Sequence, residues 1–233
     1  RYYQWEFVET WEFHSHYVTS LKYFVDNNTM PPSYSVGYRN GLHNPDSSLY
    51  VCYQSAPSSN IFIGSTAKLS NDVVYLPLVF IPHADWKLSV LYSIEVKQHA
   101  LTKEGYEFLE RMKKNTETTG SVFDAQPSEL NGNIHCITDP TEPVIGYINI
   151  SPVYSKRIFI SNSQLPDWGY EQSCFRMEID NISDSIKLKG LGLTPTYPNK
   201  LGMFGAILTF YVSSVECVDC TLRGTNVKPS FWP

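Results

Sequence analysis

The chain has 233 residues, of which 42% are hydrophobic and 18% charged, a composition typical of a folded globular protein. Its formal net charge of -5 and the lack of any block of basic residues argue against a nucleic-acid partner. No uninterrupted apolar stretch of about 18 residues occurs, since the run from Val73 to Ile81 ends at Pro82, so we expect no membrane-spanning helix.

The first predicted strand lies at the very start of the chain. Arg1 opens a sequence with no initiator methionine, no apolar signal core and no lipid-acceptor cysteine, so we expect a processed or truncated chain. From Tyr3 to Phe13, the odd-numbered positions are aromatic except for Glu9, and the even-numbered positions are mostly polar. This period of two predicts a half-buried strand whose aromatic face lies in the core.

Further strands are predicted where Val, Ile, Tyr and Phe are concentrated between clusters of Pro, Gly, Asn, Asp and Ser. These runs cover residues 49–54, 61–66, 73–81, 87–99, 144–150, 157–161, 175–179 and 206–215. Their spacing predicts a mainly β, antiparallel fold, either barrel-like or a sandwich. No internal repeat and no clear linker divides the chain, so we expect residues 1–233 to form a single domain.

One helix interrupts this pattern, at about residues 102–114. Thr102 is a candidate N-cap, and Glu104 lies in the first turn. Tyr106, Leu109 and Met112 are three residues apart and share one face. We expect this helix to pack across a sheet or to close the open end of a barrel.

The five cysteines are Cys52, Cys136, Cys174, Cys217 and Cys220. The Cys-Val-Asp-Cys spacing at 217–220 fits half a zinc site, a redox pair or the ends of two different disulfides. A second such pair is missing, and the motif follows a strand, whereas a redox motif begins a helix. Disulfides in an exported protein are the favoured interpretation, with free buried thiols and a metal site as alternatives. The odd count leaves at least one cysteine unpaired within the chain, and the connectivity stays open.

Catalytic and metal-binding motifs are weak. His14 and His16 lie on one face of the first strand at a spacing that suits two zinc ligands, but no third ligand is nearby, so hydrogen-bonded or solvated imidazoles are favoured. Nucleophile and phosphate-binding motifs are missing. Glu9, Glu95 and Asp180 are candidates for a glycosidase pair, although any chain with 23 acidic residues offers such a set. We therefore assign no catalytic residue, metal or cofactor.

Three tryptophans outside the regular strands are the ligand-binding candidates. Trp86, Trp168 and Trp232 lie in turn-like contexts, where an indole combines apolar area with a polar N–H group. We expect these side chains to be available for exposed contacts, with core packing as the alternative.

Several longer segments together resemble a known family. They are Trp5–Phe13, Tyr92–Gln98, Leu109–Glu117, Gly120–Ile134, Val144–Tyr147, Lys156–Ile160, Cys217–Cys220 and Lys228–Trp232. In these segments the chain resembles the C-terminal portion of the Bacteroidetes outer-membrane lipoproteins catalogued as domain of unknown function family 4249. The resemblance covers nearly the whole chain.

This resemblance implies a location and a partner, but no catalytic residues, because the family has no established activity. Such proteins have an N-terminal lipidated cysteine and an immunoglobulin-like domain ahead of the region seen here, and their genes lie beside those of TonB-dependent transporters. We therefore expect a non-catalytic lipoprotein, anchored by lipid to the outer membrane at the cell surface, that acts as an accessory or ligand-capture partner of such a transporter. The alternatives are a structural subunit of an outer-membrane assembly or secretion complex, and a hydrolase of glycans or peptides.

Two further hypotheses concern single segments. The connection Gly120–Ile134 is either a contact surface or a loop bonded against the sheet, with Phe123 and Leu130 as its apolar anchors. The tripeptide around Ser185 resembles the acceptor of Bacteroidetes O-glycosylation, which makes Ser185 a candidate modification site.

Overall fold

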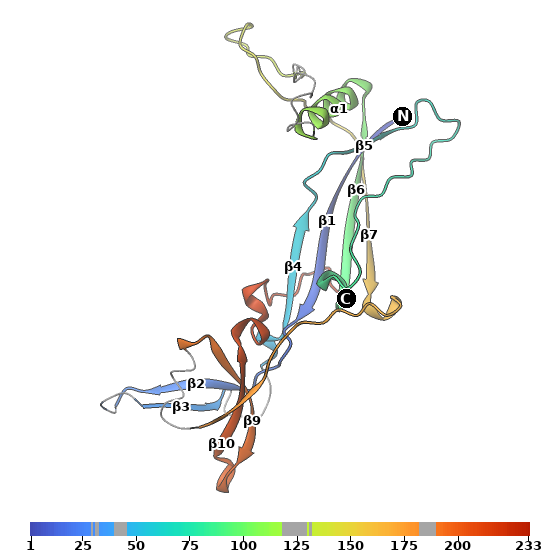
Figure 1. The fold of residues 1–233 in the computed structure, drawn as a ribbon. Coiled ribbons are helices and arrows are strands. Elements are labelled where there is room, and N and C mark those ends of the chain that lie inside the picture. The colour runs from blue at the N-terminus through green and yellow to red at the C-terminus, as the bar shows by residue number, and fades with distance from the viewer. Residues whose placement is uncertain (29, 31–32, 40–45, 118–129, 131, 182–189) are drawn as a thin grey trace, which may run out of the picture. The chain divides into compact units, whose positions relative to one another are not determined.

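The computed structural model describes residues 1–28, 30, 33–39, 46–117, 130, 132–181 and 190–233. The described residues form ten strands, one α-helix and six short 3-10 helices (Figure 1). The strands are β1 (Tyr2–His14), β2 (Leu21–Asp26), β3 (Ser33–Tyr38), β4 (Val51–Pro57), β5 (Phe62–Ser65), β6 (Leu91–Leu101), β7 (Val153–Ser161), β8 (Met177–Asp180), β9 (Leu193–Leu201) and β10 (Ile207–Ser214). The helix α1 spans Lys103–Glu117. The prediction of a mainly β fold with one helix is confirmed.

The strands form three sheets in a chain that divides into two compact units. Unit 1 comprises residues 1–9, 56–80 and 93–159, and unit 2 comprises residues 10–55, 81–92 and 160–233. The sheet orders are β4-β1-β6-β7 with β5 on β1, then β8-β10-β9, and β2-β3. Paired strands run antiparallel, as expected, and none of these three sheets closes into a barrel.

The helix of unit 1 begins with the expected cap. Thr102 Oγ1 accepts a hydrogen bond from the N–H of Gly105 over 3.1 Å, which satisfies one of the free donors of the first turn. Phe108 is buried and stacks on Tyr147, with ring centroids 5.5 Å apart. Among the described residues, no helix combines the length and the apolar character needed to cross a membrane.

A charged network links β6 and β7 within unit 1. Arg157 Nη2 donates to Glu95 Oε2 over 2.6 Å, and Arg157 Nη1 donates to Ser93 Oγ over 3.1 Å. Ser155 Oγ donates to the other oxygen of Glu95 over 2.9 Å. All four residues have odd numbers. Because strand side chains alternate between the two faces of a sheet, the even-numbered residues of β6 and β7 face the other side.

Unit 2 contains a small two-layer arrangement of strands. The β2-β3 hairpin packs on the β8-β10-β9 sheet through Leu21, Val36, Phe210 and Val212, all of them buried. The side chain of Asn181 joins the layers, because its Oδ1 accepts from the Val36 N–H over 3.1 Å and its Nδ2 donates to the Val36 carbonyl over 3.2 Å. This part of the chain fits the sandwich expectation.

Two disulfides lie in unit 2. Cys52 is bonded to Cys220 across 168 positions of sequence, and Cys174 is bonded to Cys217 across 43 positions. The motif at 217–220 therefore supplies one end to each of two different disulfides. The thiol of Cys136, in unit 1, is free and half-exposed.

Two of the predicted strands are not strands in the structure. Residues 73–81 run without a β ladder, since Pro77 in their middle has no N–H to donate. In residues 144–150, both backbone groups of Ile148 bond to the side-chain amide of Asn133, each over 2.8 Å. The Asn133 amide thus makes the hydrogen bonds to Ile148 that the backbone of a neighbouring strand would otherwise make.

Three strands were missed by the prediction, namely β2, β3 and β9. Strand β9 contains Pro195 and Pro198, which argue against a strand in a sheet interior. It lies at the edge of its sheet, where proline is tolerated, and its pairing with β10 is irregular. In β2, the apolar alternation is broken by the adjacent Phe24 and Val25.

Candidate functional site

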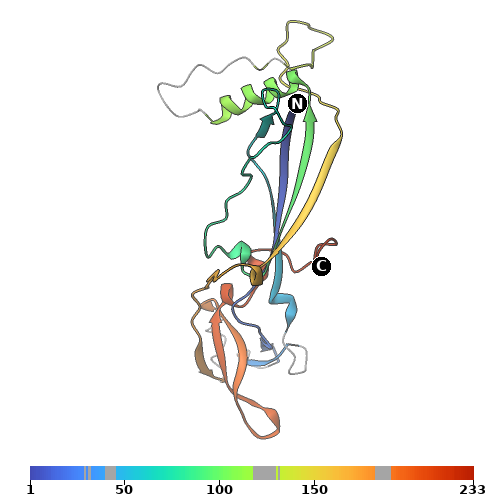
Figure 2. The same cartoon turned by 90° about the vertical axis from the view of Figure 1, so that its right-hand side faces the viewer.

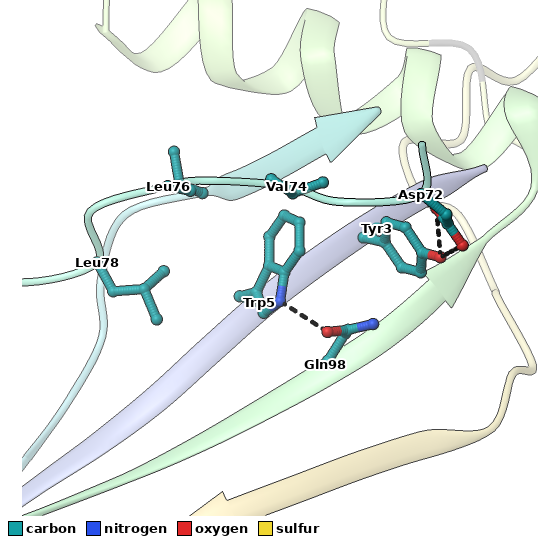
Figure 3. Close-up of a pocket in the computed structure, with 7 residues that line it drawn as sticks. All are labelled: Tyr3, Trp5, Asp72, Val74, Leu76, Leu78 and Gln98. Atoms are coloured by element: carbon teal, nitrogen blue, oxygen red, sulfur yellow. Dashed lines mark hydrogen bonds between the residues drawn. The ribbon is translucent and has the colours of Figure 1, made fainter. Parts of the chain in front are cut away.

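An aromatic groove lies on the even-numbered face of β6 and β7 in unit 1. Tyr3 and Trp5 from β1 and Gln98 from β6 line its floor, as Figure 3 shows. The indole Nε1 of Trp5 donates a hydrogen bond to Gln98 Oε1 over 3.2 Å. This bond satisfies the indole N–H and joins the two strands at the floor of the groove.

Residues 72–78 form one wall of the groove. Val74, Leu76 and Leu78 line this side of the groove (Figure 3), whereas Tyr75 and Pro77 are not among its lining residues. Gly64 in β5 permits this close packing, because a Cβ atom there would lie 3.0 Å from the Trp5 ring and 3.2 Å from Val74. The wall is therefore held against the indole by apolar contacts.

The start of this wall is anchored by the carboxylate of Asp72. Thr66 Oγ1 donates to Asp72 Oδ1 over 2.6 Å, and the Tyr3 hydroxyl donates to Asp72 Oδ2 over 2.9 Å. Arg1 forms an ion pair with the same carboxylate over 2.7 Å. The hydrogen bonds from Thr66 and Tyr3, with a smaller contribution from the charge of Arg1, hold the pKa of Asp72 below its usual value.

The groove consists of two hollows that share Trp5 and Gln98. The hollow beside the wall has a volume of about 170 Å³. The other, of about 320 Å³, lies over β6 and β7. Besides the two shared residues, the larger hollow is lined by Val96, Tyr154, Lys156 and Ile158.

The groove offers flat apolar surface together with a few polar groups. Tyr154 is 69% exposed, and its ring and the Trp5 indole can stack on an aromatic or apolar group. Lys156 adds a positive charge in the larger hollow, and Gln98 adds amide hydrogen-bonding groups. Within the described ranges, no group of three or more His, Cys, Asp or Glu side chains is placed to hold a metal ion.

Two of the predicted tryptophans pack within unit 2 and do not line this groove. Trp86 contacts Trp11 and Phe13 edge to face, with ring centroids 5.5 and 4.8 Å apart. The indole of Trp168 donates to the carbonyl of Asp85 over 2.8 Å. Both are half-buried, so part of each ring is accessible.

Trp232 departs from the expectation of an exposed side chain. It is only 7% exposed, because its ring packs on Tyr53 with the centroids 5.4 Å apart. Its Nε1 donates to a carboxylate oxygen of Glu12 over 2.9 Å. Both the apolar and the polar part of the indole are thus engaged within unit 2.

His14, the last residue of β1, and His16, which lies beyond the strand, have separate partners. His14 Nε2 lies 3.0 Å from Glu12 Oε1, and its ring lies 4.6 Å from that of Tyr50. His16 contacts Tyr17 edge to face, with the centroids 4.5 Å apart. Both histidines border an open depression of about 430 Å³ in unit 2.

Two other hypotheses fall largely outside the described residues. Ser185, the candidate for O-glycosylation, is not among the described residues, and neither is Phe123. Of the connection Gly120–Ile134, the structure describes Leu130 and residues 132–134.

The period of two in β1 predicts an aromatic face in the core, which holds for only part of the strand. Phe7, Trp11 and Phe13 are buried, whereas Tyr3 and Trp5 are half-buried and line the groove. The groove residues on β7 and on the wall were missed. One signal was available: Gly64 within a predicted strand indicates close approach of another group.

The family model described as Domain of unknown function (DUF4249) matches residues 1–157, which is more than half of the chain and includes both β1 and β6. No curated protein and no solved structure matches the chain. The chain belongs to the family described as Domain of unknown function (DUF4249).

Proposed function

We propose that the protein is a non-catalytic lipoprotein of the outer membrane, and that it serves as an accessory or ligand-capture partner of a TonB-dependent transporter. The aromatic groove of unit 1 is the observation that carries this proposal. An open surface formed by Trp5, Tyr154 and apolar neighbours is costly to leave in water, and such surfaces mark binding sites on soluble proteins. The identity of the proposed partner, a TonB-dependent transporter, rests on the family resemblance and not on the groove.

The groove has the features of a contact site for a flat apolar group. Its floor is rigid, because the Trp5 indole is fixed by Gln98 and by the close approach of Gly64. A preformed aromatic surface loses little conformational entropy on binding, which favours affinity. Lys156 favours a ligand or partner segment that also carries a negative charge.

The disulfides support a location outside the cytoplasm. Cys52–Cys220 and Cys174–Cys217 are of the kind that persists in oxidising compartments, such as the periplasm or the cell surface. Attachment to the membrane through a lipid-modified cysteine upstream is part of the proposal and rests on the family resemblance.

The test is affinity purification of the full-length protein from its native outer membrane in mild detergent, with mass spectrometry of the proteins that accompany it. We expect a TonB-dependent transporter at near-equal abundance with the wild type. Tyr154→Ala is expected to lower its recovery about tenfold, because truncating one exposed aromatic contact residue removes a large share of the binding energy. Tyr75→Ala is the matched control, since Tyr75 belongs to unit 1, is fully exposed and does not line the groove.

Three outcomes would contradict the proposal. Recovery of the wild type alone would remove the transporter as a partner. An assembly or secretion component at near-equal abundance would favour the structural-subunit alternative. Equal recovery with Tyr154→Ala and Tyr75→Ala would show that the groove is not the contact surface.

A further inference from the structure

The turn between β9 and β10 in unit 2 exposes two large apolar side chains. Met203 is 80% exposed and Phe204 is 99% exposed. Leu201 and Leu208, on the two strands next to the turn, are about half-exposed as well. Figures 1 and 2 show this turn as the loop at the lower end of the drawing. We call residues 201–208 the hairpin tip.

The hairpin tip carries no charge. Its sequence is Leu-Gly-Met-Phe-Gly-Ala-Ile-Leu, and the charged residue nearest to it in the sequence is Lys200, directly before the tip. Lys200 Nζ lies 3.2 Å from a carboxylate oxygen of Glu178, which places an ion pair where the apolar stretch ends. Moving the tip out of water therefore requires no desolvation of an ionised side chain.

The backbone of the turn forms its own hydrogen bonds. The N–H of Gly202 donates to the carbonyl of Ala206 over 2.7 Å, and the N–H of Gly205 donates to the carbonyl of Gly202 over 3.2 Å. In a medium without water, backbone N–H and C=O groups have to form their hydrogen bonds within the protein, as these groups do.

The backbone at Phe204 is strained for that residue. Its φ is 62° and its ψ is 21°, in the left-handed region that bulky side chains seldom adopt and that glycine adopts freely. A glycine here would suit the turn better. Phe204 therefore has a conformational cost that burial of its side chain does not offset. A residue kept under these conditions points to a role in binding and not in stabilising the fold.

We propose that the hairpin tip inserts Met203 and Phe204 into the interfacial region of a lipid bilayer. A convex tip with two to four apolar side chains suits a fluid medium, since a lipid surface needs no complementary pocket. Aromatic rings are favoured at the level of the headgroups, and Lys200 lies at the base of the tip, where it remains in the aqueous layer. The groove plays no part in this inference.

The test is co-sedimentation of the full 233-residue chain with phosphatidylcholine vesicles. We expect binding by the wild type that persists in 1 M salt, because the contact is apolar and not ionic. We expect Phe204→Gly and Met203→Ser each to lower the vesicle partition coefficient by about tenfold, since each removes one large, exposed apolar side chain that the bilayer would take out of water. Val227→Ser is the matched control, because Val227 is 68% exposed in unit 2 and lies outside the tip.

Phe204→Gly separates a role in binding from a role in folding. We expect its melting temperature to equal or exceed that of the wild type, because glycine relieves the left-handed strain. A large drop in melting temperature would make Phe204 a structural residue and overturn the inference. No binding by the wild type, or an equal loss in Val227→Ser, would also overturn it. Tyr154→Ala is expected to bind vesicles as the wild type does, so failure here is distinguishable from failure of the proposed function.

Discussion

The indole nitrogen of Trp232 donates a hydrogen bond to Glu12 Oε2 over 2.9 Å, between residues 220 positions apart in the sequence. The other oxygen of Glu12 lies 3.0 Å from His14 Nε2. Tyr53 packs against the Trp232 ring, and burial, together with the negative charge of Glu12, raises the pKa of Tyr53. One carboxylate thus joins the C-terminal residues of unit 2 to the end of β1.

Trp232→Phe is expected to destabilise unit 2. The substitution keeps most of the ring but removes the N–H donor to the Glu12 carboxylate. Loss of a hydrogen bond to a charged, partly buried group should lower the free energy of unfolding by about 1–2 kcal/mol. Urea denaturation under non-reducing conditions measures this change. Trp168→Phe is the matched control, because its indole donates to a neutral carbonyl, and equal losses for the two variants would contradict the prediction.

The two disulfides are expected to differ in what they contribute to stability. In the chain-entropy model, a disulfide that closes a longer loop restricts the unfolded chain more strongly. The Cys52–Cys220 pair closes a loop with a sequence separation of 168, against 43 for Cys174–Cys217. Removing the first pair by double Cys→Ala substitution should therefore cost about 1 kcal/mol more than removing the second.

Chemical denaturation of the two double variants measures this difference. The wild type should be alkylated under non-reducing conditions at Cys136 and not at the other four cysteines, which confirms the pairing before the comparison. Equal stability of the two double variants would show that native packing around the disulfides outweighs loop entropy. Alkylation of any of the four paired cysteines would contradict the pairing itself.

Local sequence signals predicted those elements whose structure depends on neighbours in the chain. The period of two in Tyr3–Phe13 predicted β1, and the threonine at position 102 marked the start of α1. Both signals depend on geometry within a few residues, namely the alternation of strand side chains and the free N–H groups of a first helical turn. The antiparallel fold class followed from the number and spacing of such runs.

The groove and β9 depended on information that the local sequence does not contain. The alternation in β1 is the same at Trp5 and at Trp11, yet Trp11 is buried and Trp5 lines a groove. The difference depends on what covers each end of the strand, which is set by tertiary packing. Likewise, Pro195 is tolerated in β9 because β9 is an edge strand, and edge position is a property of the assembled sheet.

Asp72→Ala is expected to loosen the wall of the groove. The carboxylate of Asp72 accepts hydrogen bonds from Thr66 and Tyr3, and these bonds hold the start of the wall. Without them, chymotrypsin should cleave the chain severalfold faster after Tyr75, within the wall, or after Phe80, just beyond it. Asp139→Ala is the control, since Asp139 also accepts bonds from a nearby threonine but does not line the groove. Equal cleavage rates would show that apolar contacts alone hold the wall.

The stabilising effect of Asp72 should also depend on pH, with a defined sign. Its pKa is lowered in the folded protein, so its contribution is complete above the pKa of an unfolded aspartate. The contribution is lost as the pH falls through the lowered pKa of the folded state. The difference in the free energy of unfolding between wild type and Asp72→Ala should therefore shrink on acidification. A difference that stays constant with pH would contradict the role assigned to the carboxylate charge.

Tyr23 gives a second pH dependence, of opposite sign. Its hydroxyl donates to the carbonyl of Leu193 over 2.9 Å, and burial raises its pKa to about 12 from 10.0. The folded state favours the neutral phenol, so the contribution of Tyr23 to stability is complete below pH 10.0 and is lost as the pH rises through about 12. Tyr23→Phe should therefore flatten the fall in the free energy of unfolding across this range.

Urea denaturation across this alkaline range measures the slope, with the Cys136 thiol alkylated beforehand so that the disulfides do not exchange. Tyr75→Phe is the control, because Tyr75 is fully exposed and its substitution should leave the wild-type slope unchanged. If Tyr23→Phe retained the wild-type slope, the alkaline fall in the free energy of unfolding would not be caused by burial of the Tyr23 hydroxyl against β9. A flatter slope in Tyr23→Phe alone would link the packing of the β2-β3 hairpin on its neighbouring sheet to the protonation of a single phenol.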